Sequence, residues 1–194
     1  MIEKLIKANR SYRRFNQDKP VNSDLLKELV NLARLSASAA NLQPLKYIIS
    51  SDINLNEQIF STLGWAAYLK DWKSPKEGEK PAAYIIILLD TEISNNKWSA
   101  YDCGIASQSI LLAAAEKGLG GCMIGSVNKK RLAQILNIKP HLEIMLVIAL
   151  GNSAEKVIIE AISDNNDIKY FRDEKDVHHV PKRSLEDIII KVYN

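Results

Sequence analysis

The stretch that most constrains the fold is AAYIIILL, residues Ala82–Leu89, which contains no charged side chain and is rich in isoleucine. Its length is that of one strand and far short of a membrane-spanning helix. Because both alternating sets of side chains are apolar, such a strand needs cover on both faces. We therefore predict a strand at the centre of a sheet that has helices on each side.

The rest of the chain alternates between strand and helix patterns, with short loops between them. Further strands are expected at residues 46–50, 120–127 and 143–150. Helices are expected from a cap at Ser23, over 54–72 with a break near Gly64, over 98–117 with a stop at Gly118, and over 129–136 with a cap at Asn128. This alternation predicts an α+β domain with three layers, α/β/α.

The segment after Gly151 differs from the rest because it is polar and has no apolar periodicity of its own for about 30 residues. A helix is expected again at SLEDIIIKVY, with Ser184 as its N-cap. A segment of this kind either wraps the body of its own domain or pairs with another subunit. We predict a single domain, 1–194, in which residues 152–194 form a C-terminal arm.

Composition excludes several classes of protein. The chain has 26 basic and 23 acidic residues, a net charge of +3, which is too small for a protein that tracks nucleic-acid phosphates. Cys103 and Cys122 lack the spacing of a metal site or a redox pair, and we expect both to be free and buried. The N-terminus, MIEKLIKANR, lacks the apolar run of a signal peptide. We expect a cytoplasmic protein that binds neither nucleic acid nor membrane.

The first motif is ANRSYRRF, residues Ala8–Phe15, with three arginines in five positions. The guanidinium groups of Arg10 and Arg13, with the hydroxyl of Ser11 between them, suit a phosphate group. The alternative is a solvated basic surface.

The second motif is SAANLQP, residues Ser38–Pro44. Ser38, Asn41 and Gln43 carry groups that donate and accept hydrogen bonds, which suits a ligand with N–H and C=O edges. The alternative is a turn in which these side chains bond to their own backbone.

The third motif is GLGGCMIG, residues Gly118–Gly125, where glycines would let a flat ligand approach the backbone N–H groups. The alternative is a helix cap followed by a tight entry into a strand. It is not a dinucleotide-binding fingerprint, because no GxGxxG opens a helix directly after a strand.

The fourth motif is HHVPKRSLEDI, residues His178–Ile188. Lys182 and Arg183 lie at the start of a helix, where cations oppose the helix dipole unless an anion binds there. We interpret His178 and His179 as structural or exposed residues, because neither has a cysteine or carboxylate at ligand spacing, and we predict no metal site.

Taken together and in this order, the four motifs resemble the nitroreductase-like FMN-dependent oxidoreductase family, in its small single-domain bacterial type. The resemblance runs from about Leu5 to Ile189. It implies a mostly antiparallel sheet flanked by helices and a homodimer in which the C-terminal segments are exchanged. The sequence departs from the family pattern at Ala37, where proline is usual, and at Leu45, which replaces a frequent tryptophan.

The resemblance also implies roles for individual residues. Those at the FMN phosphate are Arg10, Ser11, Arg13, Lys182 and Arg183, with Arg14 facing outward. Those near the isoalloxazine ring, supplied by the neighbouring subunit, are Ser38, Ala39, Asn41 and Gln43. Those near flavin N5 or the pyrimidine edge are Ile124, Gly125 and Gln108. Those bordering a substrate pocket are Trp65, Tyr68 and Trp72.

The activity implied by the resemblance is a two-step exchange, in which NADH or NADPH reduces FMN and a nitroaromatic, quinone or similar acceptor then takes the electrons. The chemistry is carried by the flavin N5, so no catalytic side chain is expected. Three alternatives stay open: a specialised flavoenzyme of the same family (dehalogenase, enone reductase or dehydrogenase), a flavin-binding module without turnover, and a protein that binds phosphate or nucleic acid through its basic clusters.

Overall fold

The computed structural model describes residues 1–162 and 167–194 of the chain. The described residues form two compact units. The first unit comprises Met1–Trp65 and Ser74–Ala154, and the second comprises Ala66–Lys73 and Glu155–Asn194. Each is described by itself.

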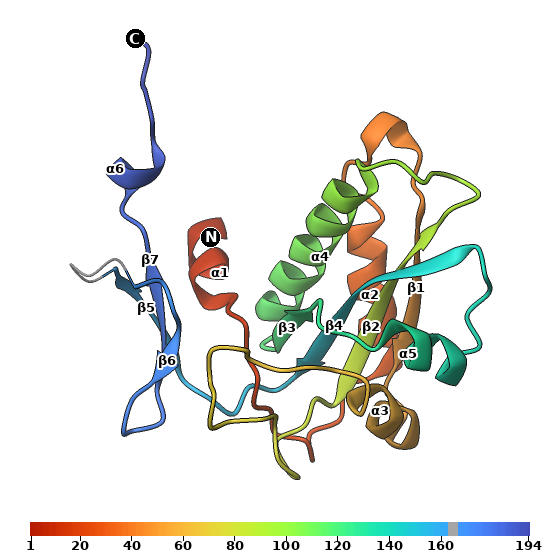
Figure 1. Ribbon diagram of the computed structural model, residues 1–194, viewed down its shortest axis with the longest axis horizontal. Coiled ribbons are helices and arrows are strands. Elements are labelled where there is room, and N and C mark those ends of the chain that lie inside the picture. Colours follow the sequence, from red (N-terminus) through yellow and green to blue (C-terminus); the bar gives the residue numbers. More distant parts are fainter. Residues whose placement is uncertain (163–166) are drawn as a thin grey trace. The chain divides into compact units, whose positions relative to one another are not determined.

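The first unit contains a four-stranded sheet in the order β1-β2-β4-β3 (Figure 1). All of its neighbouring strands are antiparallel. The strands are β1 (Leu45–Ser50), β2 (Ala83–Asp90), β3 (Gly120–Ile124) and β4 (Leu142–Gly151). Each of the four strands predicted from the sequence is confirmed, and so is the mixed α/β fold with an antiparallel sheet.

Helices cover both faces of this sheet, which gives the predicted three layers. The helices of the first unit are α1 (Ile2–Ala8), α2 (Ser23–Ala33), α3 (Ile53–Phe60), α4 (Ser99–Glu116) and α5 (Lys129–Ile135), with a short 3₁₀ turn at Ala39–Asn41. Residues of α2 and α4 pack in one hydrophobic cluster, and residues of α3 and α5 pack in the other. Figure 1 shows α2 and α4 together on one side of the strands.

Strand β2 links the two clusters, because its side chains alternate between them. Ile85 and Ile87 belong to the cluster under α2 and α4, whereas Tyr84 and Ile86 belong to the other. All four are 0% exposed. Each buried aliphatic side chain of this size contributes about 1.5–3 kcal/mol, so β2 is the centre of the core, as the apolar run predicts.

In the first unit, local signals at helix ends are confirmed in two places and wrong in one. The side chain of Asn128 accepts a hydrogen bond from the Arg131 amide (3.1 Å) and begins α5, and Gly118, at φ 77°, follows the end of α4 in the left-handed conformation. The N-cap of α2 is Asn22 and not Ser23. Asn22 has extended backbone angles and its side chain accepts from the Asp24 amide (2.8 Å), so Ser23 is already helical.

The helix predicted over 54–72 is wrong in its second half, because α3 ends at Phe60. The residues after it pair with a neighbouring segment instead. Leu63 forms a β-bridge with Val127, and the Gly64 amide donates to the carbonyl of Ser126 (2.8 Å). Backbone groups that find partners across the fold are not available to continue a helix.

The second unit has a sheet that the sequence analysis did not predict. Its strands are β5 (Val157–Ala161), β6 (Phe171–Arg172) and β7 (His178–Lys182), in the order β5-β7-β6, and β5 is parallel to β7. The helix expected over SLEDIIIKVY is reduced to α6 (Leu185–Ile188). It ends at Ile189, whose backbone is extended, as suits a run of β-branched residues.

Candidate functional site

The first motif lies directly beside strand β3, which belongs to the third motif. Ser11 forms a parallel β-bridge with Gly121, and the Tyr12 amide donates to the Gly121 carbonyl (3.0 Å). On the other side, the Asn16 amide donates to the carbonyl of Asn152 (2.8 Å). The structure thus brings together two of the four motifs, although about a hundred residues separate them in the sequence.

The arginines of the first motif differ in their surroundings. Arg10 donates from Nη2 to the carbonyl of Ile6 (2.6 Å), while its Nε is buried with no hydrogen-bond partner among the described residues. Arg13 donates from Nη1 to the Ser11 carbonyl (3.2 Å). The expectation that Arg14 faces outward is wrong. Its side chain is 17% exposed and its Nε lies 3.5 Å from Glu79, a carboxylate that holds it against the body of the unit.

Two glycines of the third motif are required by packing. A Cβ on Gly120 would lie 2.8 Å from the Tyr12 ring, and one on Gly121 would lie 2.9 Å from Leu150. The alternative interpretation of this motif, a tight entry into a strand, therefore explains Gly120 and Gly121. Gly125 is different, because it is exposed and the nearest atom to its Cβ position is 4.0 Å away. Contact between a ligand and Ile124 or Gly125 stays a prediction.

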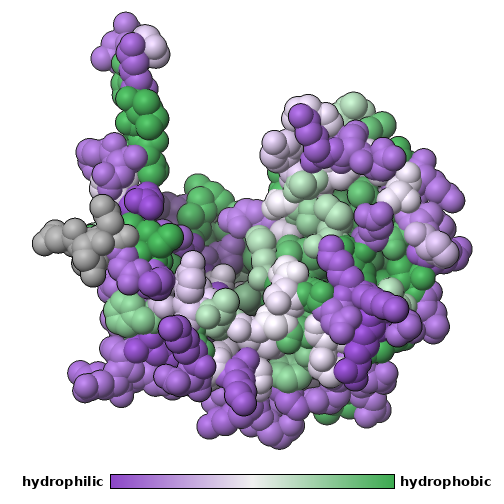
Figure 2. Space-filling view, in the orientation of Figure 1, coloured by the Kyte–Doolittle hydropathy of each residue, from purple (hydrophilic) through white to green (hydrophobic). Residues whose placement is uncertain are grey.

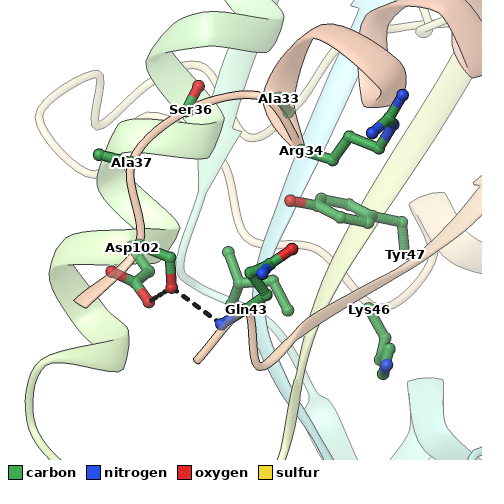
Figure 3. Close-up of a pocket in the computed structure, with 10 residues that line it drawn as sticks. Ala33, Arg34, Ser36, Ala37, Gln43, Lys46, Tyr47 and Asp102 are labelled. Carbon is green, nitrogen blue, oxygen red and sulfur yellow. Dashed lines mark hydrogen bonds between the residues drawn. The ribbon is translucent and has the colours of Figure 1, made fainter. Parts of the chain in front are cut away.

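The second motif is held by a residue that the sequence analysis missed. The Ser38 hydroxyl donates to Oδ2 of Asp102 (2.7 Å), and the Ala39 amide donates to Oδ1 (2.9 Å). Figure 3 shows Asp102, on α4, against this loop. Asp102 is 5% exposed. The sequence offers one indication of this role. Asp102 lies on the apolar side of a long helix, where a buried carboxylate needs a hydrogen-bonding partner.

Hydrogen bonds within the loop use most of the groups that were assigned to a ligand. The Gln43 amide donates to the Ser38 Oγ (3.0 Å), and Gln43 Nε2 donates to the side-chain oxygen of Asn41 (3.1 Å). The alternative of a turn that satisfies its own backbone therefore describes much of this motif. Contacts between FMN and Ser38, Ala39, Asn41 or Gln43 stay predictions. Asn41 and Gln43 are exposed.

A cavity of about 240 Å³ lies behind the loop (Figure 3). Its walls are the end of α2, the loop, the start of β1 and Asp102. The ring of Tyr47 points into the space between Arg34 and Gln43. Burial, with smaller contributions from the charges of Cys103 and Asp102, raises the pKa of Tyr47 to about 12. The phenol is therefore a neutral hydrogen-bond donor at physiological pH.

Gln108 and the two cysteines also lie in the first unit. Gln108 is exposed on α4, and its Oε1 accepts a long hydrogen bond (3.5 Å) from Nδ2 of Asn9, which belongs to the first motif. Cys103 and Cys122 are free and buried, as predicted.

The last motif lies in the second unit. Lys182 and Arg183 are exposed where β7 ends, just before α6. Ser184 caps α6 as predicted, and a reciprocal bond to Asp187 completes a capping box. This box already uses the amides of Asp187 and Ser184, so an anion there would depend mainly on the two cationic side chains. That these cations meet the first motif at one phosphate stays a prediction.

The two histidines have structural roles, as interpreted from the sequence. His178 is 1% exposed and its ring lies 5.2 Å from that of Tyr170. His179 joins Glu160 (2.8 Å) and Asp173 (3.2 Å). Hydrogen bonds to Glu160 and then to Asp173 raise the pKa of His179 above its ordinary value of 6.5.

The three aromatic residues assigned to a substrate pocket divide between the units. Trp65 packs on Phe60 in the first unit (5.7 Å between ring centroids). In the second unit, Tyr68 packs on Tyr170 and Trp72 lies under the guanidinium of Arg172. Their place at a substrate pocket stays a prediction.

One group of potential metal ligands occurs at the end of β2. The group contains three residues, Asp90, Glu92 and His141. Each offers one ligand atom, and these atoms lie within 4.8 Å of one another. The Glu92 side chain is 74% exposed, and exposed groups of this kind are common without an ion. The expectation of no metal stays a prediction.

Known proteins resemble this chain over most of its length. The profile of the nitroreductase family matches residues 6–152. A protein of Methanothermobacter thermautotrophicus with the provisional name NADH dehydrogenase/NAD(P)H nitroreductase is 31% identical over 156 residues, which cover 77% of this chain and 76% of the relative. The iodotyrosine deiodinase of Thermotoga neapolitana is 25% identical over 78% of this chain and 88% of that protein.

A solved structure shows the same fold. The FMN-dependent nitroreductase of Clostridium difficile superposes with a TM-score of 0.64 at 22% identity, over 86% of this chain and 94% of that one. Among the described residues, none of the helices has the length and apolar character needed to cross a bilayer.

Proposed function

The chain belongs to the nitroreductase family, and on that premise we propose that it is an FMN-dependent oxidoreductase. Its electron donor is NADH or NADPH, and its acceptors are nitroaromatics, quinones or similar small molecules. FMN bound to the protein supplies the redox chemistry, by taking a hydride at N5 and passing the electrons on. The protein supplies binding, orientation and electrostatics.

The observation that carries this proposal is the unsatisfied Nε of Arg10, next to the pairing of Ser11 with Gly121. A buried guanidinium N–H without a partner costs free energy, and a bound anionic oxygen would remove that cost. Arg10 belongs to the motif that resembles the family's phosphate-binding sequence. The donors present here are therefore of the kind that a flavin phosphate requires.

In this proposal the phosphate is held by the residues that the resemblance assigns to it. Arg10, Ser11 and Arg13 of the first motif supply hydrogen-bond donors, and Lys182 and Arg183 of the fourth motif supply charge. A phosphomonoester carries about −1.5 to −2 charges at neutral pH, and four cationic groups compensate that charge. Lys182 and Arg183 are exposed, which suits such a role.

The flavin ring would lie near the second and third motifs. Asn41, Gln43 and the backbone at Ile124 and Gly125 are the groups that we assign to it, with Gln108 as a further polar neighbour. We propose no catalytic side chain, because proton and electron transfer at a flavin do not need a nucleophile or a triad.

We also propose a homodimer in which residues 152–194 wrap the partner subunit. Large apolar side chains are exposed on α1 and α4 and along the C-terminal segment: Ile6 (47%), Tyr101 (61%), Ile105 (41%), Ile190 (94%) and Val192 (66%). Figure 2 shows the hydrophobic run along the C-terminal segment. Apolar surface of this extent is typical of an interface. Sedimentation of the full chain and of Tyr101→Glu tests it, because the variant should shift the equilibrium to monomer.

A cytoplasmic location is part of the same proposal. It is supported by two buried cysteines that are free and not joined in a disulfide, as is usual in a reducing compartment.

Flavin titration tests the cofactor. Each charge-assisted hydrogen bond contributes roughly 1.5–3 kcal/mol, so Arg10→Ala and Arg183→Ala should each weaken FMN binding by about ten- to a hundredfold. Arg131→Ala, an exposed arginine on α5, is the matched control and should leave affinity unchanged. Unchanged affinity in both site variants would refute the assignment. Protein that is colourless and takes up no FMN would favour a binder of phosphate or nucleic acid.

A second candidate within the family is reductive dehalogenation, favoured by the similarity to an iodotyrosine deiodinase. Steady-state oxidation of NADH with a nitroarene, a quinone, an enone and a halogenated phenol separates these activities. A flavin-binding module without turnover would oxidise NADH with none of them.

A further inference from the structure

The starting point is the carboxylate of Asp102, which lies in the first turn of α4 and is 5% exposed. Both of its oxygens accept hydrogen bonds from the second motif, from the Ser38 hydroxyl (2.7 Å) and the Ala39 amide (2.9 Å). No described lysine or arginine pairs with it. The two hydrogen bonds satisfy the buried carboxylate, and they also fix the position of the loop.

The loop needs such a support because its backbone is strained. Ala40 (φ 50°), Asn41 (φ 54°) and Gln43 (φ 51°) are in the left-handed region, which non-glycine residues rarely adopt. Residues hold this conformation when the surrounding structure determines it. Here, hydrogen bonds hold the loop in its strained conformation.

The support reaches both ends of the strained segment. Asp102 binds the N-terminal end directly through Ala39. It binds the C-terminal end through Ser38, whose Oγ donates to Asp102 and accepts from the Gln43 amide (3.0 Å). One carboxylate thus closes a chain of bonds from α4 through Ser38 to Gln43 (Figure 3).

We propose that Asp102 is a positioning residue of the flavin site, and that Ser38 and Ala39 serve the flavin by binding Asp102. This inference rests on the proposed function. Their two donor hydrogens are already given to the carboxylate, and Gln43 Nε2 donates to Asn41. The groups left for a ligand are therefore the Asn41 NH₂ and the side-chain carbonyl of Gln43, both on exposed residues. Asp102 shapes the loop that presents them.

The carboxylate accepts two hydrogen bonds from the loop. Asparagine is not a suitable replacement for a test, because its NH₂ could donate to the Ser38 hydroxyl oxygen and both bonds would remain. Asp102→Ala removes both acceptors, so that neither the Ala39 N–H nor the Ser38 O–H keeps its bond to α4. The loop should then leave its strained conformation, although the core under α4 is unchanged.

Hydrogen exchange on the protein without FMN tests the loop. In Asp102→Ala, the Ala39 and Gln43 amides should exchange at least tenfold faster than in wild type. The matched control is Ser107→Ala, which removes a buried hydrogen bond of the same helix (Ser107 Oγ to the Cys103 carbonyl, 2.6 Å) without touching the loop. These amides should be unaffected in the control.

Flavin titration then tests the link to binding. Asp102→Ala and Ser38→Ala should each weaken FMN binding by about ten- to a hundredfold. The double variant should be no weaker than the worse single one, because the two residues act in one chain of bonds. Ser38→Thr, which keeps the hydroxyl, should bind FMN as wild type does. Ser107→Ala should also do so.

Two results would overturn the positioning role. One is unchanged exchange at Ala39 and Gln43 in Asp102→Ala, and the other is FMN affinity in that variant equal to that of Ser107→Ala. A wild-type protein that takes up no FMN is a different result, because it refutes the proposed function and this inference together.

Discussion

The two units of this protein hold their sheets in different ways. In the first, strand β2 is buried on both faces by two apolar clusters. In the second, the one buried residue among those described is His178, and charged groups join the strands. Glu155 and Arg172 pair at 2.7 Å with side-chain exposures of 1% and 10%. The comparison teaches that apolar burial specifies the body, whereas a few polar contacts specify the C-terminal segment.

The largest effect should come from a deletion in the apolar unit. Ile87→Ala removes side-chain volume that two layers cannot refill, and should lower the free energy of unfolding by about 2–5 kcal/mol. Urea denaturation measures it. Ile53→Ala, on a residue that is 67% exposed, is the control and should change little. Equal losses in the two variants would contradict the assignment of β2 to the centre of the core.

A smaller and local effect is expected from the buried ion pair. Glu155→Gln keeps the shape of the side chain but removes the charge that faces Arg172, at a cost of about 1.5–3 kcal/mol. The loss should be seen as faster amide exchange in β6 and β7, with the amides of β2 unchanged. Glu174→Gln, at an exposed position, is the control. An equal increase in amide exchange in both sheets would show that the units unfold together, and it would contradict the difference between them.

The histidine clamp should make the second unit sensitive to pH. The pKa of His179 is raised by Glu160 and then Asp173, so its contribution is present below the ordinary value of 6.5 and is lost as pH rises through the raised value. The pKa of Asp173 is lowered by the Val177 amide first. Its contribution is therefore present above the ordinary value of 3.8 and lost as pH falls through the lowered one.

Amide protection of β5 and β7 across the pH range measures this clamp. Protection should be greatest between pH 3.8 and pH 6.5, the two ordinary pKa values, and should fall as pH rises above 6.5. The fall should be smaller than the loss in Glu155→Gln, because solvent reaches the clamp. His179→Gln should remove the fall at high pH. A wild-type protein with flat protection from pH 6 to pH 9 would contradict the prediction.

The smallest effect is expected at an exposed ion pair of the first unit. Lys117 and Glu28 lie 2.6 Å apart with side chains 40% and 47% exposed. Solvent and salt screen such a pair, so Lys117→Ala should leave the urea midpoint within error of wild type. A clear loss would mean that charges also hold the apolar unit.

Sequence reasoning succeeded where the signal is local or dense. The β2 run and the caps at Asn128 and Gly118 follow from neighbouring residues, because burial pattern and backbone angle act over a few positions. It failed where partners are distant. Residues 62–64 pair with 126–128 and so leave the helix predicted over 54–72, and Glu79 holds Arg14 inward.

For the candidate site, the sequence predicted which residues form a binding motif, but it did not predict where the fold places them. Arg10 and Ser11 were predicted as a binding motif, but that they lie beside Gly121 depends on the sheet. The strands of the second unit lack an alternating apolar pattern, and so no periodicity predicted them. Charged side chains and backbone pairing hold these strands together, and such strands are hard to predict from a single sequence.

What the sequence by itself determined is the framework: an apolar strand that needs two layers of cover, helices that begin and end at their own capping residues, and four motifs in a characteristic order. The tertiary structure alone decided that the carboxylate of Asp102 supports a loop 63 and 64 residues before it in the chain. The physical reason is range. Propensity and capping act between near neighbours, whereas a buried carboxylate is satisfied by whatever donors the finished fold brings to it.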